Sequence, residues 1–326
     1  MTTIARTTSA TDADFAVYLA RMRAELDSRL SALLPEVGHE RDLLAAAMRE
    51  SALAPGKRLR PLLLLLTAES LGGCKAAALD LGCAIEMVHA ASLVLDDLPC
   101  MDNAALRRGR PTLHLAFGED VAILAAIALL SRAFGVAAAL HTVEPEQRNR
   151  LIAIMSQTIG AHGLVRGQLQ DLRDGATVRS AEQIAETNQL KTGVLFAAIM
   201  DMACLLGHAH EGVRQPLQRF ASELGQAFQL QDDLRDCDPD TGKDLGKDAG
   251  KSTLFALCGE TQTRHRLHSH LEAAEQCLEQ VFLAEQPIGC LLRAVFANGR
   301  SPLAQSNFCA SVRSAEVQVD ISRSTS

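Results

Sequence analysis

Apolar residues recur at intervals of three and four along almost the whole chain, and Ala and Leu dominate among them. This spacing places apolar side chains on one face of an α-helix, and both residue types favour helix. Alternating runs of Val, Ile and Thr, which indicate strands, are rare. The sequence therefore predicts an all-α protein. The expected helices span roughly residues 14–34, 40–52, 60–71, 76–97, 120–140, 147–172, 181–206, 212–236, 262–284 and 288–297.

The helical pattern continues without an internal linker, so residues 15–297 are expected to form one domain. The two ends of the chain differ from it. Residues 1–14 are rich in Thr and Ser, and residues 298–326 are rich in Ser and Arg with little periodicity. Segments of this composition bury too little apolar surface to offset the entropy that ordering costs. We therefore expect both ends to be mobile.

Charge and cysteine content limit the classes of function and location. The formal net charge is −7, whereas a nucleic-acid-binding protein usually carries a basic face. The nine cysteines include no C-x-x-C pair, which favours reduced thiols over a disulfide framework or a zinc site. The first residues also lack the apolar segment of a secretory signal. These features predict a cytoplasmic protein without a nucleic-acid partner.

One stretch, residues 121–140, is long and apolar enough to be compared with a membrane span. Arg132 interrupts it, Ala dominates it and Gly135 lies within it. A helix that is apolar on all sides is also expected at the centre of a large helical protein. We therefore interpret this stretch as a buried core helix and expect no membrane span.

Carboxylates gather at the end of an expected apolar helix, in the sequence DDLPCMD. Asp96 and Asp102 are six residues apart, which on a regular helix would point them about 120° away from each other. Pro99 removes a backbone donor, so we expect the helix to end or distort and Asp102 to turn back toward Asp96. Asp96 and Asp97 follow a long apolar run, where their charges are costly unless paired or bound to a metal. His89 lies seven residues before Asp96, on nearly the same helix face.

A second group of carboxylates, Asp232, Asp233 and Asp236, lies near the end of another expected helix. Residues four apart on a helix differ by about 40° in direction, so Asp232 and Asp236 share a face. Gln229 lies about two turns before Asp236 on that face. Carboxylates grouped in this way bind hard divalent cations such as Mg²⁺, which usually keeps waters and a phosphate among its ligands. Taken alone, this group is also compatible with a solvated acidic helix end.

Basic residues accompany these clusters in three short motifs. The sequence GKRLRP, residues 56–61, opens an apolar helix, and a helix N-terminus beside Lys and Arg attracts phosphate. The sequence RRGR, residues 107–110, follows the first acidic cluster, and the forked guanidinium group of Arg suits bidentate contacts with phosphate. The sequence KTG, residues 191–193, interrupts a helical stretch and offers an ammonium group and a hydroxyl. Each motif alone is also what a solvated surface carries.

Together these motifs resemble the trans-polyprenyl diphosphate synthase family, most closely the bacterial geranylgeranyl diphosphate synthases of carotenoid pathways. The residues that carry the resemblance are GKRLRP, the block EMVHAASLVLDDLPCMDNAALRRGRPT, KTG and GQAFQLQDDLRD, in this order. The resemblance runs from about residue 20 to residue 297. It implies the isoprenoid-synthase fold, a bundle of long antiparallel helices around a deep central cavity, and a homodimer.

The resemblance also implies an enzyme that joins isopentenyl diphosphate to an allylic diphosphate by ionisation, condensation and elimination. Roughly two or three Mg²⁺ ions would stabilise the departing diphosphate together with cationic side chains, Lys191 among them. The implied metal ligands are Asp96, Asp102 and Asp232, supported by Asp97, Asp233 and Asp236. The implied contacts of the allylic diphosphate are Arg107, Lys191, Thr192 and Gln229, and those of isopentenyl diphosphate, bound without metal, are Lys57, Arg60, His89 and Arg108.

Product length and one diphosphate contact are less firmly indicated. In members of this family, side-chain bulk just before the first acidic cluster can limit the product, and Ala91 and Ser92 are both small. The resemblance therefore implies C20 geranylgeranyl diphosphate rather than C15 farnesyl diphosphate, with longer products left open. Downstream of the second cluster the resemblance implies a lysine that binds diphosphate, and Lys243 and Lys247 compete for this role; Lys243 is included among the candidates, and the choice between the two stays open.

Other functions fit the sequence less well. A terpene cyclase would steer a long-lived cation with aromatic walls, but the chain has no Trp and one Tyr. A non-catalytic partner subunit would be expected to lack one acidic cluster, and both are intact. A membrane-embedded prenyltransferase needs several spanning helices, and only residues 121–140 are even ambiguous.

Overall fold

The computed structural model of the chain describes residues 12–174, 179–236, 254–283 and 286–296, so Lys243, Lys247 and residues 298–326 lie outside it. The helices are α1 (Asp12–Leu33), α2 (Leu43–Ala52), α3 (Leu59–Ser70), α4 (Lys75–Asp96), α5 (Leu113–Phe117), α6 (Glu119–Ala138), α7 (Pro145–Ile159), α8 (Leu164–Asp174), α9 (Ala181–Asn188), α10 (Val194–Leu206), α11 (Glu211–Asp236), α12 (Leu254–Val281) and α13 (Pro287–Phe296). A π-helical turn, η1 (Gln189–Gly193), joins α9 to α10, and β1 (Leu106–Arg107) pairs antiparallel with β2 (Arg110–Pro111). The all-α prediction is confirmed.

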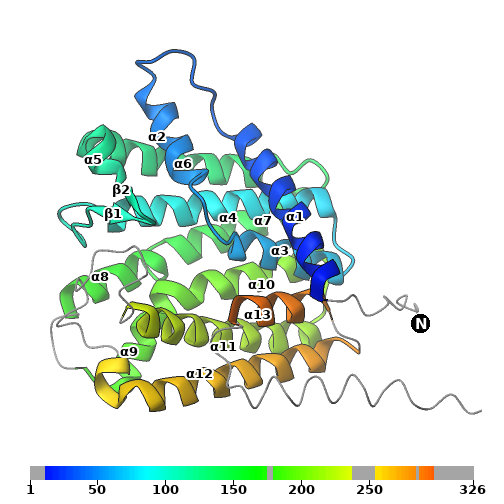
Figure 1. The fold of residues 1–326 in the computed structure, drawn as a ribbon. Coiled ribbons are helices and arrows are strands. Elements are labelled where there is room, and N and C mark those ends of the chain that lie inside the picture. The colour runs from blue at the N-terminus through cyan, green and yellow to red at the C-terminus, as the bar shows by residue number, and fades with distance from the viewer. Residues whose placement is uncertain (1–11, 175–178, 237–253, 284–285, 297–326) are drawn as a thin grey trace, which may run out of the picture.

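The apolar helix α3 lies at the centre of the bundle (Figure 1). Its five consecutive leucines, Leu62–Leu66, are each at most 1% exposed, because α1, α4, α10 and α13 all pack against this helix. Outward from α4 lies α6, and outward from α10 lie α11 and then α12. α4 and α10 run antiparallel, since Gly73 before α4 lies against Leu206 at the end of α10. The end of α4 and the start of α10 therefore meet at the opposite end of the bundle.

Two predicted helix boundaries are wrong. The helix expected over residues 147–172 is two helices, because α7 ends at Ile159 and α8 begins at Leu164. Gly160 and Gly163 lie in the turn between them, and two glycines so close together weaken a helix by about 1 kcal/mol each relative to Ala. The helix expected from residue 262 begins earlier, at Leu254, and is kinked at Gly259.

The segment between α4 and α6 contains elements that the sequence pattern does not predict. These are the β1–β2 hairpin and the short helix α5, which follow α4 at one end of the bundle (Figure 1). Strands of two residues and a helix of five are too short to leave a periodic signal. The hairpin nevertheless carries Arg107 and Arg108, two of the predicted substrate-binding residues.

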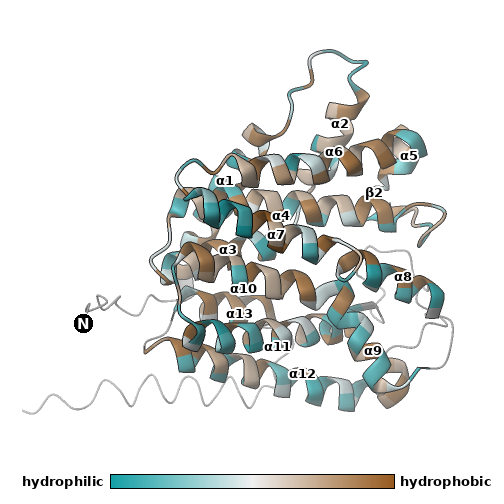
Figure 2. Ribbon diagram, turned by 180° about the vertical axis from the view of Figure 1, so that it is seen from behind, coloured by the Kyte–Doolittle hydropathy of each residue, from teal (hydrophilic) through white to brown (hydrophobic). Residues whose placement is uncertain are grey.

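Helix α6 is not buried on all sides, so that prediction is wrong. Its alanine-rich face packs on α4, because small side chains allow the two helices to approach closely. Leu129 is buried with the alanines, but other large apolar residues point outward, and the exposed fractions of Leu124 and Ile127 are 55% and 56%. Figure 2 shows α6 with hydrophobic colouring on the face seen from behind. Residues 121–140 are also not the only ambiguous stretch, since α4, α6 and the continuous α9–α10 stretch are each long and apolar enough to cross a membrane by length and composition.

Candidate active site

The end of α4 brings the carboxylates of the first acidic cluster together. α4 ends at Asp96, and the amide of Asp102 donates a hydrogen bond to the carbonyl oxygen of Asp96 at 2.9 Å. The amide of Ala104 donates to the carbonyl oxygen of Asp97 at 3.1 Å and closes the same reversal. The predicted end of the helix near Pro99 and the return of Asp102 toward Asp96 are confirmed.

The second aspartate of this cluster, Asp97, forms an ion pair with Arg107 of the hairpin. Asp97 is only 4% exposed, and Nε of Arg107 lies 3.1 and 3.2 Å from its two carboxylate oxygens. Nη2 of Arg107 also donates to Oδ1 of Asp97. This forked ion pair is the strongest geometry available to the two groups. It fixes Arg107 beside the cluster and ties the hairpin to the end of α4.

The first aspartate has a perturbed charge. Burial raises the pKa of Asp96 to about 6, and the carboxylates of Asp102 and Asp97 add to this effect, while Lys191 and Arg107 oppose it. A buried carboxylate beside other carboxylates is unfavourable in its charged form unless a cation compensates it. The end of α4 is therefore a place where a bound cation would be stabilised.

Lys191 lies on the π-helical turn η1, which confirms the predicted interruption of the helix at KTG. Its Nζ donates to Oδ2 of Asp171 on α8 at 2.8 Å. Burial opposes its charge, but Asp171 and Asp96 raise the pKa of Lys191 above its ordinary value. A β-carbon at Gly167 would lie 2.5 Å from the backbone nitrogen of Lys191, so glycine is required for α8 to approach η1 this closely. Thr192 is half-buried beside it.

Sequence reasoning missed the contribution of α8. This helix is amphipathic in the reverse sense, because Val165 and Leu169 are 58% and 55% exposed whereas Gln168, Gln170 and Asp171 face inward. Side-chain atoms of both glutamines are buried without a hydrogen-bond partner among the described residues. Polar groups buried in this way usually serve a ligand or a water molecule. The sequence signal was a helix whose polar stripe carries amides and one carboxylate.

The second acidic cluster lies on regular helix at the end of α11. Asp232 is half-buried, Asp233 is 7% exposed, and Asp236 is the last residue of α11. Gln229 was predicted to share a face with Asp232 and Asp236, and in the structure its Nε2 donates to Oδ1 of Asp233 at 3.1 Å. Asp232 interacts electrostatically with the basic residues at the start of α3. The second cluster thus faces Lys57 and Arg60, whereas the first cluster interacts with Lys191 and Arg107.

Of Lys57 and Arg60, which both interact with Asp232, Arg60 is the more buried. Its guanidinium lies 5.2 and 5.6 Å from the ring centroids of Phe196 and Phe228, and Nη1 lies 3.3 Å from Nε2 of His89. Because arginine can only donate, Nε2 of His89 accepts. Burial and the nearby arginines, with Arg60 first among them, hold the pKa of His89 well below its usual range, so the imidazole is neutral. Nε of Arg60 is buried without a hydrogen-bond partner among the described residues.

Lys57 and Arg108 complete the basic set at the rim. Burial lowers the pKa of Lys57, Arg235 adds to the effect, and Asp232 opposes it. Nη1 of Arg108 donates to the carbonyl oxygen of Pro55 at 2.7 Å, which ties the hairpin to the loop before α3. The hairpin therefore connects the first acidic cluster with the basic loop.

The residues present fit a magnesium site that a diphosphate completes. Among the described residues, no three His, Cys, Asp or Glu side chains converge closely enough to hold an ion by themselves. Mg²⁺ prefers oxygen ligands and is usually bound by one or two carboxylates together with waters and substrate phosphates. The pair Asp96 and Asp102, with the charge of Asp96 disfavoured by burial, offers such ligands on one side, and Asp232 offers one on the other.

The two residues expected to influence product length lie about one turn before Asp96. Ala91 is fully buried, and Ser92 is half-buried. Oγ of Ser92 donates to the carbonyl oxygen of His89 at 2.9 Å, within its own helix. Both side chains are small in the place where α4 approaches the acidic cluster.

Comparison with known proteins agrees with the resemblance seen in the motifs. Residues 41–284 match the family model described as polyprenyl synthetase. The chain is 56% identical over 261 residues to a geranylgeranyl diphosphate synthase of Pantoea ananas, covering 79% of this chain and 86% of that protein. It is 39% identical over 242 residues to a farnesyl diphosphate synthase of Geobacillus stearothermophilus, covering 72% and 82%.

Solved structures show the same architecture. An apo FPP/GFPP synthase from Zymomonas mobilis superposes with a TM-score of 0.77 at 32% identity, over 87% of this chain and 99% of that one. A geranyltransferase from Helicobacter pylori, complexed with magnesium and isoprenyl diphosphate, superposes with a TM-score of 0.77 at 26% identity, over 93% and 100%.

Proposed function

The chain belongs to the polyprenyl synthetase family, and we propose that it joins isopentenyl diphosphate to an allylic diphosphate of C5 to C15 to make C20 geranylgeranyl diphosphate. The observation that carries the proposal is the electrostatic cluster of Asp96, Asp102 and Lys191 where α4 meets η1, with Asp232 facing the basic start of α3. Such an arrangement suits a diphosphate bound between two acidic groups through Mg²⁺.

In the proposed reaction, the C–O bond between the allylic carbon and the diphosphate breaks, and the electron pair stays on the diphosphate. Lys191, kept charged beside Asp171, and Arg107, fixed by Asp97, place cationic donors where this negative charge develops. Mg²⁺ held by the aspartates of the two clusters would supply Lewis-acid stabilisation of the same diphosphate. No side-chain nucleophile is required.

The second substrate supplies the attacking electrons. Arg60, Lys57 and Arg108 would hold the diphosphate of isopentenyl diphosphate, and the neutral His89 orients Arg60 by accepting its hydrogen bond. The isopentenyl double bond attacks the allylic cation and forms the new C–C bond. The resulting cation loses a proton to the departed diphosphate, which restores a double bond in the product.

We further propose that product length is set near Ala91, where the small side chain leaves space in a cavity between the helices for a chain longer than C15. The small side chains of Ala91 and Ser92, about one turn before Asp96 on α4, support this proposal. The 56% identity with the Pantoea ananas enzyme, whose name states the C20 product, supports it as well. A farnesyl diphosphate synthase remains the alternative, since one of that name is 39% identical.

The assembly and location are also proposals. We propose a homodimer formed through α6, because the exposed apolar patch of Ile123, Leu124 and Ile127 is costly in water and suits a second copy. The seven cysteines among the described residues are free thiols, which supports a cytoplasmic enzyme. We propose that α4, α6 and the α9–α10 stretch pack within protein rather than span a membrane.

Product analysis tests the proposed function. The purified full chain is incubated with Mg²⁺, labelled isopentenyl diphosphate and either geranyl or farnesyl diphosphate, and the products are resolved by chain length. We expect a dominant C20 product that disappears when the metal is chelated. Products that stop at C15 would leave the reaction in place and overturn the C20 assignment. No metal-dependent product would overturn the proposed function.

A further inference from the structure

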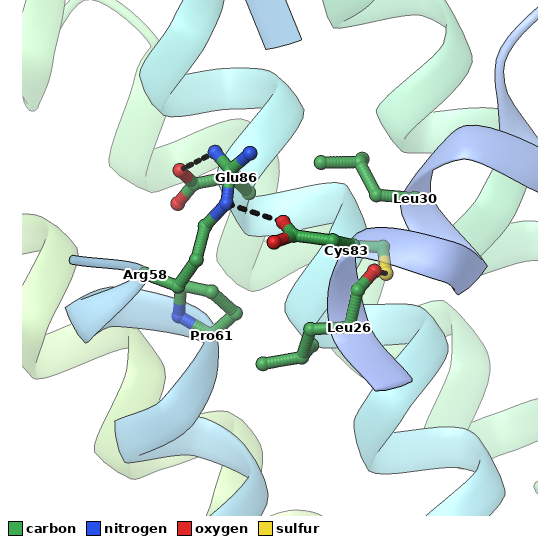
Figure 3. A pocket seen from close by; sticks show the side chains of 7 residues that line it. Leu26, Leu30, Arg58, Pro61, Cys83 and Glu86 are labelled. Atoms are coloured by element: carbon green, nitrogen blue, oxygen red, sulfur yellow. Dashed lines mark hydrogen bonds and ion pairs between the residues drawn. The ribbon is translucent and has the colours of Figure 1, made fainter. Parts of the chain in front are cut away.

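A buried ion pair holds the residue immediately before α3. Arg58 and Glu86 are each 6% exposed, and Nη1 of Arg58 lies 2.7 Å from Oε1 of Glu86 on α4. Nε of Arg58 lies 2.7 Å from Oδ1 of Asp27 on α1. Figure 3 shows the guanidinium of Arg58 between these two helices. One side chain therefore connects the start of α3 to both α1 and α4.

The surroundings of the Arg58–Glu86 pair are largely apolar, whereas Asp27 on the other side of Arg58 is half-exposed. Leu26, Leu30, Pro61 and Cys83 line the pocket around Arg58 (Figure 3). Burial raises the pKa of Cys83 to about 12, which reflects the same poor solvation. When one partner of a buried ion pair is removed, the remaining charge has no water to replace it. Arg58 and Glu86 therefore depend on each other.

The backbone at Arg58 needs this support. Arg58 has φ 50° and ψ 35°, in the left-handed region that non-glycine residues rarely adopt, and it precedes α3 without a side-chain cap. This conformation costs about 1 kcal/mol or more for a residue with a side chain. Nε of Arg23 on α1 also donates to the carbonyl oxygen of Lys57 at 3.3 Å. The turn at residues 57 and 58 is thus fixed by contacts from α1 and α4.

This turn sends neighbouring basic side chains in different directions. Arg58 points to α1 and α4, whereas Lys57 and Arg60 both interact with Asp232 of the second acidic cluster. The first turn of α3 lies directly on α4, because a β-carbon at Gly82 would lie 3.2 Å from Cβ of Pro61. The ion pair and this close contact together set the height and rotation of α3 relative to His89 and the first cluster.

Glu86 also sets the charge of the subsite. It is the buried carboxylate paired with Arg58, and it acts electrostatically on Arg60 and Arg108 as well. Because its hydrogen bond goes to Arg58, the positive charges of Arg60 and Arg108 remain available to an anion. Without Glu86, the buried charge of Arg58 would lack its buried partner.

We propose that Arg58, through its ion pair with Glu86 and its contact with Asp27, is a positioning residue for the isopentenyl diphosphate subsite: it holds the left-handed turn that directs Lys57 and Arg60 toward the substrate. The inference rests on the proposed function. Arg58 touches no substrate itself and acts through the backbone at its own position.

Steady-state kinetics of the full chain with both substrates tests the proposal. Each substrate is varied while the other is saturating, for Arg58→Lys, Arg58→Ala and Arg58→Gly. We expect Arg58→Ala to raise KM for isopentenyl diphosphate by about 10- to 100-fold, with KM for farnesyl diphosphate within about twofold of wild type. Arg58→Gly tolerates the left-handed turn without strain, so its KM should lie between those of Arg58→Ala and wild type. Arg58→Lys should show the same selective rise at smaller size.

The control variant breaks an ion pair that joins α1 directly to α4, the two helices that Arg58 contacts. Arg29 on α1 and Asp80 on α4 are joined at 2.6 Å, away from residues 57 and 58. We expect Asp80→Asn to leave both KM values unchanged, and Asp27→Asn to raise KM for isopentenyl diphosphate slightly. Thermal unfolding of each variant shows which ones fold. If Arg58→Ala does not fold, Arg58→Lys and Asp27→Asn decide the question.

Three outcomes would overturn the proposal. These are an equal rise of both KM values, a fall of kcat with both KM values unchanged, or the same KM shift in Asp80→Asn. Each leaves the proposed function standing, because wild-type activity is measured in the same experiment. If wild type forms no metal-dependent product, the proposed function fails first, and the positioning role fails with it.

Discussion

The two acidic clusters are built on different backbones but divide their aspartates in the same way. The first lies where α4 ends and the chain reverses, and the second lies on regular helix at the end of α11. In each adjacent pair the second aspartate is buried and held within the chain, Asp97 by Arg107 and Asp233 by Gln229. The first aspartate of each pair, Asp96 or Asp232, is less buried, and it interacts with cations of other elements, Lys191 for Asp96 and Lys57 for Asp232.

Asp97 and Asp233, the inner aspartates of the two clusters, have partners of different charge. Asp97 has an arginine partner that also belongs to the hairpin, whereas Asp233 has a neutral amide one turn earlier on its own helix. The first cluster is therefore tied to the β1–β2 hairpin by an ion pair, while the second has a hydrogen bond from a residue of its own helix. A pair of adjacent aspartates thus combines one residue for the site with one for the scaffold.

The largest expected effect comes from the outer aspartates. Asp96→Ala and Asp232→Ala should each lower kcat by about 10³-fold or more, because each removes carboxylate oxygens that would hold Mg²⁺ beside the diphosphate. Product formation at saturating substrate and Mg²⁺ measures the effect, and circular dichroism should show unchanged helicity. A near-normal rate in either variant would break the equivalence of the two clusters.

A smaller loss is expected from Lys191, which interacts with the first cluster rather than the second. Lys191→Ala should lower kcat by about 10²-fold, since it removes one cationic donor from the departing diphosphate. Asp171→Asn keeps Lys191 but removes its charged partner, so it should lower kcat by less than Lys191→Ala does. Single-turnover rates separate this effect from substrate binding. If Lys191→Ala changed only KM for isopentenyl diphosphate, Lys191 would belong to the other substrate.

The inner aspartates should differ in stability. Asp97→Asn should lower the free energy of unfolding by about 1–3 kcal/mol, because it leaves a partly buried arginine without its charged partner. Asp233→Asn keeps a group that can hydrogen-bond the amide of Gln229 and should cost less than about 1 kcal/mol. Urea unfolding measures both. The control is Arg110→Ala in the same hairpin, which breaks an exposed ion pair with Glu50 of α2 and should change the free energy of unfolding little. Equal losses in the two aspartate variants would remove the proposed difference.

The smallest effect on rate is expected from a substitution beside the first cluster, Ala91→Tyr, which should instead change the chain length of the product. Ala91→Tyr should shorten the main product from C20 to C15, because the ring fills space about one turn before Asp96. Ala90→Tyr is the control, since adjacent residues point about 100° apart and the carbonyl of Ala90 faces Ser51 of α2. Resolving the products by length gives the answer. An unchanged C20 product in Ala91→Tyr would place the limit on length elsewhere.

The sequence was sufficient for the helices and for the aspartates, because helical periodicity and charge grouping are local signals. The reversal that returns Asp102 to Asp96 could be predicted from Pro99 and the six-residue spacing. The resemblance implied that Asp96 rather than Asp97 binds metal, but residue spacing alone does not show it, because the burial of Asp97 depends on Arg107 in a hairpin too short to leave a pattern. Asp171 was missed for a related reason, since its role appears only when Gly167 brings α8 against η1.

The exposure of α6 shows another limit of sequence reasoning. A helix rich in Ala, Leu and Ile reads as apolar on all sides, so its buried and exposed faces cannot be separated by polarity. In the structure most of its alanines are buried, whereas Leu124 and Ile127 point outward, because close packing favours small side chains. The outward face becomes informative only once the rest of the bundle is in place.

The most direct test of the central claim, that both clusters hold one diphosphate together, is a double-mutant cycle on diphosphate binding. Calorimetric titration of inorganic diphosphate in the presence of Mg²⁺ would compare wild type, Asp96→Asn, Asp232→Asn and the double variant. If the clusters share one ligand, the double variant should bind about as weakly as the weaker single variant, with a coupling energy of about 1 kcal/mol or more. Additive losses, with no coupling between Asp96 and Asp232, would contradict the shared site.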